Sequence, residues 1–161
     1  FLLVDPQGFL RQKDSTNNII LKKTDLDLSD VNAIKINPEE GQNIVSGSHD
    51  EMMLALQKKG IEYVLLTNKS NVSLLVKNRV YSLKLPNKNI HDTTGIGDIF
   101  CSAFTCTMLK EKDFLWALCF AAGSAQAALE SNNVGLQKIP KKGMVENNAS
   151  YFYNLVDFRD L

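Results

Sequence analysis

The segment that decides the fold is Asp92-Thr93-Thr94-Gly95-Ile96-Gly97-Asp98-Ile99-Phe100. Gly95 and Gly97 are separated by a single residue. From Ile99 onward, apolar residues recur at helical spacing. A glycine turn at the start of a helix lets backbone N–H groups converge at the positive end of the helix dipole, so it favours a bound anion. Asp98, in the first helical turn, is either a partner of that dipole or a general base beside the anion.

The same pattern also fits a tight loop followed by an acidic helical turn that binds nothing. Two better-known phosphate-binding motifs are excluded. A dinucleotide fingerprint needs its third glycine where Phe100 stands, and no Gly-Lys-Ser or Gly-Lys-Thr of a Walker loop occurs in the chain.

Strands and helices alternate on both sides of this segment. Apolar runs and turn residues predict a central strand at 1–4, followed by a turn at 5–8 and a polar loop at 11–18. Further strands are predicted at 33–36, 63–67, 72–77 and 79–85. Periodicity and capping residues predict helices at 26–31, from Ser48 to Gly60, from Ile96 onward, at 114–130 and at 141–156. Ser48 and Glu51 form a predicted capping box, Asp113 is the predicted cap of the helix 114–130, and the last helix has an apolar stripe of Val145, Ala149, Phe152 and Val156. This alternation predicts an α/β domain with a mostly parallel sheet.

Composition limits the class of protein. The chain has 161 residues, enough for one domain, with 18 basic and 18 acidic side chains and a formal net charge of +0. A balanced charge and the lack of a membrane-length apolar run predict that it binds neither nucleic acid nor membrane. Cys101, Cys106 and Cys119 form no Cys-x-x-Cys pair, which predicts reduced, buried thiols and a cytoplasmic location. His49 and His91 form no zinc pattern.

The segment 92–98 resembles the D-T-x-G-A-G-D signature of the ribokinase (PfkB) family of carbohydrate kinases and departs from it only at Ile96. Three further passages follow in family order: Asp5 to Arg11 is similar to its D-x-x-G-x-x-R segment, Asn37-Pro38-Glu39-Glu40 to its N-x-x-E motif, and Tyr63–Thr67 to the strand that runs along the nucleotide. The resemblance implies a three-layer αβα ribokinase-like fold. Residues 1–161 would be the C-terminal, nucleotide-binding and catalytic part of a single kinase domain. Because Phe1 stands inside an apolar strand, we expect the N-terminal substrate and lid part to be absent.

The resemblance also implies roles for individual residues. Asp98 would take the proton from the acceptor hydroxyl, and the N–H groups of Gly95, Ile96 and Gly97 would form an anion hole for the transferred phosphoryl group. The remaining residues would contact the nucleotide or the metals. Asn37 and Glu40 would hold Mg²⁺ through water beside the nucleotide, Thr67 and Thr94 would contact the nucleotide, and Asp92 and Thr93 would hold a monovalent cation such as K⁺.

Several residues have structural alternatives. Asn37 and Glu40 could simply end a strand before a solvated acidic pair, and Thr67 could satisfy its own backbone. An Asp5–Arg11 ion pair closing a turn is the expected role of those two residues, and the alternative for Arg11 is that it faces a substrate or a lid. On the purine side the chain departs from the family: Lys69 replaces a common glycine, and Ala121-Ala122-Gly123 replaces a common asparagine.

The resulting hypothesis is an ATP- and Mg²⁺-dependent kinase that phosphorylates a hydroxyl of a sugar, polyol or nucleoside, with a homodimer formed through the lid region. The alternatives are a non-catalytic nucleotide- or metabolite-binding module, or an inactive fragment of such a kinase. The sequence does not name the acceptor, because the family's acceptor specificity lies mainly in the N-terminal half.

Overall fold

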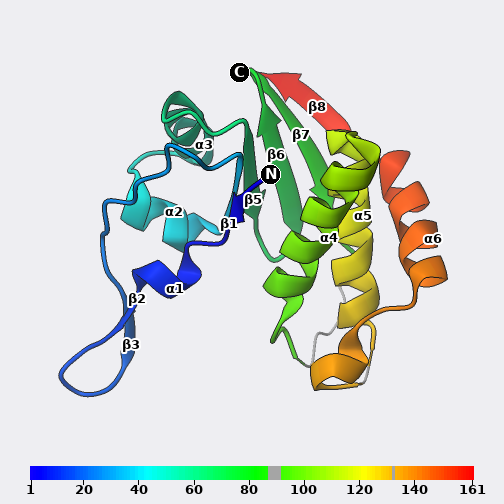
Figure 1. Cartoon of the computed structure of the whole chain (residues 1–161), viewed down its shortest axis with the longest axis horizontal. Helices are drawn as coiled ribbons and strands as arrows, with labels where there is room; N and C mark the ends of the chain where they lie inside the picture. The colour runs from blue at the N-terminus through cyan, green and yellow to red at the C-terminus, as the bar shows by residue number, and fades with distance from the viewer. Residues whose placement is uncertain (87–91, 132) are drawn as a thin grey trace. The chain divides into compact units, whose positions relative to one another are not determined.

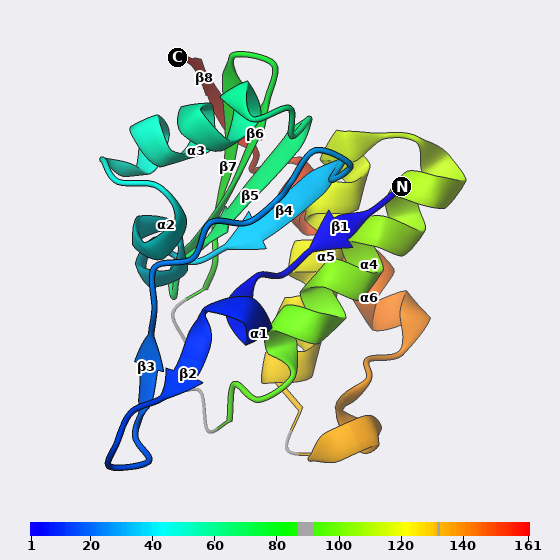
Figure 2. The same ribbon diagram turned by 60° about the vertical axis from the view of Figure 1, so that its left-hand side comes forward.

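A computed structural model describes residues 1–86, 92–131 and 133–161 (Figure 1). One sheet holds six strands in the order β1 (Leu3–Val4), β4 (Ala33–Ile36), β5 (Tyr63–Thr67), β6 (Asn71–Val76), β7 (Arg79–Lys84) and β8 (Asp157–Asp160). β1, β4 and β5 run parallel, with Val4 opposite Ile34 and Ile36 opposite Leu66 (Figure 2). β6 and β7 are joined by a two-residue turn, which only antiparallel neighbours allow.

The chain divides into two compact units. The first comprises Phe1–Lys69, Ser73–Val80 and Phe158–Leu161, and the second comprises Ser70–Val72 and Tyr81–Asp157.

The first unit is built on the parallel strands. Its helices are α1 (Gln7–Leu10), α2 (Pro38–Ile44) and α3 (His49–Lys58), and β2 (Arg11–Lys13) pairs with β3 (Ile19–Leu21) in a separate antiparallel ribbon. All four residues of β4 are buried, as expected of a parallel strand whose sheet is covered on both faces. The apolar core joins the strands to the helices and includes Ile34, Ile36, Met53, Leu56 and Val64.

The second unit contains α4 (Ile96–Glu111), α5 (Phe114–Leu129), the short 3₁₀ helix η1 (Gly135–Lys138) and α6 (Lys142–Tyr153). The three α-helices lie side by side in both views (Figures 1 and 2). α5 is buried over most of its length, and Asp113 caps it by accepting hydrogen bonds from the N–H groups of Leu115 and Trp116. Within the described residues, no helix is long and apolar enough to cross a membrane.

Most predicted elements are confirmed to within a few residues, including the Ser48–Glu51 capping box of α3 and the buried stripe of α6. Others were wrong. Residues 26–31 form no helix. Residues 11–13 of the predicted loop 11–18 form strand β2, and helix α1 begins at Gln7, within the predicted turn 5–8. β1 is an edge strand rather than a central one, and Phe1 is 44% exposed.

The cysteines also differ from expectation. None forms a disulfide, but only Cys119 is buried, whereas Cys101 is half-buried and Cys106 is exposed on α4. Burial raises the pKa of the Cys119 thiol to about 12, with a smaller contribution from the charge of Asp113. His91, which was predicted to have no role in a zinc site, lies outside the described residues.

Candidate active site

The start of α4 has the geometry that the two glycines predicted. Gly95 is the N-cap and adopts a left-handed conformation with φ of 76°, which a residue with a β-carbon rarely adopts. No side chain caps this end of the helix. The first intrahelical bond runs from the Ile99 N–H to the Gly95 carbonyl, at 3.0 Å.

The N–H groups at this end are not equivalent. The Ile96 N–H donates to the Thr93 carbonyl at 3.2 Å, so the chain itself already satisfies this predicted anion-hole donor. In the described part of the chain, the N–H groups of Gly95, Gly97 and Asp98 have no acceptor. A bound anion is one of the partners that can satisfy donors at a helix N-terminus.

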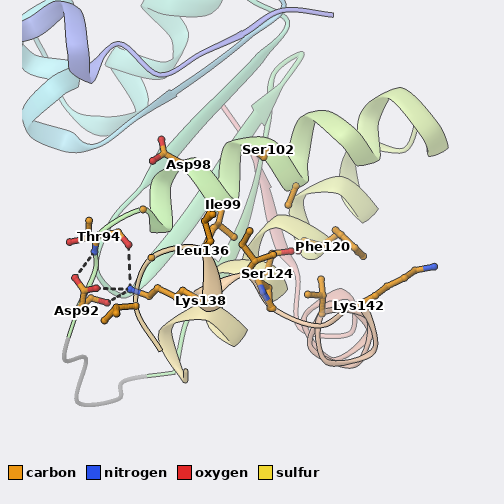
Figure 3. Close-up of a pocket in the computed structure, with 17 residues that line it drawn as sticks. Asp92, Thr94, Asp98, Ile99, Ser102, Phe120, Ser124, Leu136, Lys138 and Lys142 are labelled. Atoms are coloured by element: carbon orange, nitrogen blue, oxygen red, sulfur yellow. Dashed lines mark hydrogen bonds and ion pairs between the residues drawn. The ribbon is translucent and has the colours of Figure 1, made fainter. Parts of the chain in front are cut away.

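The side chain of Asp98 is exposed. It accepts no hydrogen bond and forms no ion pair with any described residue. In Figure 3 it extends from the first turn of α4 away from the cluster formed by Asp92 and Lys138. Asp98 therefore does not cap its own helix, and its carboxylate is available to another molecule.

Asp92 and Lys138 form a compact polar cluster below the start of α4 (Figure 3). The Lys138 Nζ donates to the Asp92 carbonyl at 2.8 Å and to the Thr94 carbonyl at 3.3 Å, and it lies 3.1 Å from Asp92 Oδ2. Asp92 Oδ1 accepts from the Thr94 N–H at 2.9 Å. Hydrogen bonds from Thr94 and then from Lys138 lower the pKa of Asp92 to about 2.

A pocket of about 780 Å³ opens beside this cluster. Its walls come from the start of α4, the middle of α5, the segment 134–140 and the start of α6. Apolar side chains dominate the walls, including Ile99, Phe120, Leu136 and Ile139, while Asp92, Thr94, Gly95, Asp98 and Lys138 provide polar groups. An apolar cavity with a few converging polar groups is the usual form of a small-molecule site.

Asn37 and Glu40 lie in the first unit, at the N-terminus of α2. They form a capping box: Asn37 Oδ1 accepts from the Glu40 N–H at 2.8 Å, and Glu40 Oε2 accepts from the Asn37 N–H at 2.9 Å. Glu40 is only 1% exposed, and its Oε2 lies 4.0 Å from Lys35 Nζ. Because Asn37 Oδ1 and Glu40 Oε2 already accept hydrogen bonds, these two atoms suit contact with a metal through bound water better than direct ligation. The Mg²⁺ role of the pair stays a prediction.

Asp5 pairs with Lys35, at 2.9 Å, and not with Arg11 as expected. Arg11 lies in the exposed strand β2 and forms no ion pair with any described residue. Thr67 donates its hydroxyl to the Ile36 carbonyl at 3.3 Å. The parallel strands β1 and β4 are followed directly by Asp5 and Asn37, and β5 ends at Thr67. These three residues thus lie at the carboxyl ends of neighbouring strands, which is where α/β sheets bind ligands.

The structure thus gathers the predicted residues into two groups, one in each unit. Asn37, Glu40 and Thr67 belong to the first unit, and the residues from Asp92 to Asp98 belong to the second. Asp92 and Thr93 were the predicted ligands of a monovalent cation. In the structure, the Lys138 ammonium group contacts the carbonyls of Asp92 and Thr94, and not that of Thr93. Sequence analysis missed Lys138, which carries no local motif and reaches the cluster only through the fold.

The family comparison agrees with this geometry. The model of the pfkB family of carbohydrate kinases matches residues 10–142, which include the start of α4, the Asn37–Glu40 pair and Lys138. The chain belongs to the pfkB family. No curated protein matches it.

Solved structures place this pfkB-family chain in the ribokinase-like fold. A pyrophosphate-dependent kinase of the ribokinase family, complexed with a pyrophosphate analogue and myo-inositol, is 20% identical, with a TM-score of 0.74 over 91% of this chain and 52% of its own. The ribokinase of Thermotoga maritima is 17% identical, with a TM-score of 0.71 over 92% of this chain and 48% of its own. The ribokinase of Arabidopsis thaliana, complexed with ribose and ATP, is 21% identical, with a TM-score of 0.61 over 76% and 42%.

These matches confirm the predicted fold class: an α/β ribokinase-like fold with a mostly parallel sheet core. The chain spans about half the length of the solved pfkB-family relatives.

Proposed function

We propose that this chain carries the donor-binding and catalytic groups of a kinase that transfers a phosphoryl group to a hydroxyl of a sugar, polyol or nucleoside. The observation that carries the proposal is the carboxylate of Asp98, which has no partner among the described residues. It lies in the first turn of α4, beside helix N–H groups for which the described residues offer no acceptor, and Asp98 lines the pocket. A base beside an anion site is what phosphoryl transfer requires of a protein, since the reaction depends on positioning and charge stabilisation.

The proposed roles follow from the contacts. Asp98 accepts the proton of the acceptor hydroxyl as that oxygen attacks the phosphorus atom. The N–H groups of Gly95, Gly97 and Asp98 stabilise the charge on the transferred phosphoryl oxygens. The Ile96 N–H contributes less to this anion hole, because it is bound to the Thr93 carbonyl.

The pocket is the proposed site of the nucleotide. Its apolar walls suit the faces of a purine, and Thr94 lines the side nearest the anion hole. The segment 121–123, where the family commonly has an asparagine, is buried, and Gly123 packs against the backbone of α6. Ser124 faces the pocket, but its hydroxyl donates to the Phe120 carbonyl at 2.8 Å. Purine recognition is therefore mainly apolar in this proposal.

Asn37 and Glu40 are proposed to hold the waters of Mg²⁺, and Thr67 to contact the nucleotide. Bound Mg²⁺ would neutralise phosphate charge. Because Mg²⁺ usually keeps several of its waters, residues that contact the metal through those waters suit this site. Glu40 is held in place for this role by the capping box and by nearby Lys35.

The test is Asp98→Asn in the natural protein, assayed by ADP release with a panel of sugars, polyols and nucleosides. Turnover is expected to fall by about 10²–10⁴-fold, while ATP affinity changes little, because the amide keeps the shape but cannot accept the proton. Glu111→Gln, an exposed substitution at the far end of α4, is the control and should leave turnover unchanged. Near-normal turnover in Asp98→Asn would overturn the assignment.

The donor is tested in the same assay by replacing ATP with pyrophosphate. Solved relatives include kinases that use pyrophosphate and a ribokinase solved with ATP, so both donors belong in the panel. The large apolar pocket favours ATP. If no acceptor is phosphorylated with either donor while ATP still binds, the alternative of a non-catalytic nucleotide-binding module is the better description.

A further inference from the structure

Lys138 is buried, which is unusual for a lysine. Its side chain is 4% exposed, and its ammonium group contacts two backbone carbonyls and one carboxylate oxygen, all from the turn 92–94. A buried ammonium is costly unless its protons are matched by acceptors, and here three oxygens lie between 2.8 and 3.3 Å from Nζ. These contacts satisfy all three protons.

This oxygen set is also what a weakly hydrated monovalent cation would need. Carbonyl and carboxylate oxygens are hard ligands, and an ammonium group and K⁺ have similar radii and similar distances to oxygen. The turn 92–94 is therefore a cation site in its chemistry, but K⁺ does not fit there in addition to Lys138. The two would compete for the same three oxygens and repel each other.

We propose that Lys138 is a tethered substitute for a bound monovalent cation, so that this chain holds its catalytic turn in place without K⁺. The ammonium group neutralises the oxygens of Asp92 and Thr94. It also links the pocket wall at η1 to the turn that precedes Gly95, across 46 residues of sequence. Lys138 is thus a positioning residue for the anion hole. Its effect on catalysis rests on the proposed function, whereas its occupation of the cation site does not.

The experiment removes the ammonium group and offers K⁺ in its place. Lys138→Met keeps much of the apolar stem, and Lys138→Gln keeps a neutral donor. The melting temperature of each variant is measured in KCl, NaCl and choline chloride at equal ionic strength. Lys110→Met, which changes an exposed lysine on α4, is the matched control.

The wild-type protein and Lys110→Met are expected to melt at the same temperature in all three salts. Both Lys138 variants should melt lower in NaCl and choline chloride. KCl should raise their melting temperatures specifically and saturably by roughly 4 °C, the shift expected of a ligand present at about ten times its Kd. In the active protein, turnover of the Lys138 variants should likewise depend on K⁺, while that of the wild type should not.

Three results would overturn the proposal. Stabilisation of the wild type by K⁺ would show that K⁺ reaches the site with Lys138 present. Equal loss of stability in all three salts, or failure of both variants to fold even in KCl, would show that the ammonium group does not stand in for a cation. If the wild type transfers no phosphoryl group in any salt, only the proposed function fails, because the melting experiment does not depend on activity.

Discussion

Asp92 shows, at the scale of single residues, how an accessible carboxylate acquires a low pKa. The hydroxyl and N–H of Thr94 and the ammonium group of Lys138 all stabilise its charged form, so its pKa falls from 3.8 to about 2. The pKa in the folded protein is lower than in the unfolded chain. Asp92 therefore contributes stability that is present above pH 3.8 and is lost as the pH falls through about 2.

We predict that the difference in melting temperature between the wild type and Asp92→Asn is constant at neutral pH and shrinks as the pH falls from 3.8 towards 2. The substitution removes the charge but keeps an oxygen for Lys138. Thermal unfolding of both proteins across this pH series measures the effect, and acid titration of other carboxyl groups cancels in the difference. A difference that does not vary with pH would contradict the low pKa.

At the scale of elements, the contact between α5 and α6 depends on Gly123. A β-carbon there would lie 2.9 Å from both the Ala149 nitrogen and the Val145 carbonyl oxygen, closer than packing allows. Both atoms belong to the backbone of α6, so relief requires the helices to move apart. Gly123 therefore fixes the distance between two helices that contribute walls to the pocket.

Gly123→Ala is expected to destabilise the protein by about 1–3 kcal/mol, the usual cost of overpacking. Gly143→Ala is the matched control, because Gly143 lies in α6 and a β-carbon there meets no atom within 4 Å. The control should be neutral or stabilising by up to about 1 kcal/mol. Denaturant unfolding of both variants compares them, and equal free energies of unfolding would refute the steric account.

The elements that sequence predicted well are those with local signals. Ser48 and Asp113 cap α3 and α5 as their positions indicated, because a cap is specified within four residues. α2 was missed, although Asn37, Pro38 and Glu40 form a capping box with proline at the first helical position. That signal was present in the sequence, but it was interpreted as the end of a strand and as a family motif, not as the start of a helix.

Other elements carry no usable signal. All four residues of β8 are exposed, so its sequence lacks the apolar alternation of a strand. The predicted helix at 26–31 does not form. The Asp27 carboxylate instead accepts hydrogen bonds from the Ser29 N–H and hydroxyl, a local turn that competes with a helix. In the site, the residues from Asp92 to Asp98 could be predicted because one helix start contains them. Lys138 could not, because only the fold brings it to them.

At the scale of the whole molecule, the proposed reaction draws on both units. The first supplies Asn37, Glu40 and Thr67, at the carboxyl ends of two parallel strands, and the second supplies Asp98, the N–H groups and the pocket. In the proposal, the first group acts through the waters of a metal and the second acts on the transferred phosphoryl group.

The three thiols of the second unit are unequally buried. Their rates of chemical labelling can therefore report when the buried helix α5 becomes exposed. Exposed Cys106 should react with a thiol-modifying reagent at once, whereas Cys119, with its raised pKa, should react only when α5 is uncovered. Mass spectrometry over time should therefore show an early label at Cys106 and a late one at Cys119. ATP that binds the folded pocket should slow the late label without changing the early one. Early labelling of Cys119 would mean that α5 is not a stable core.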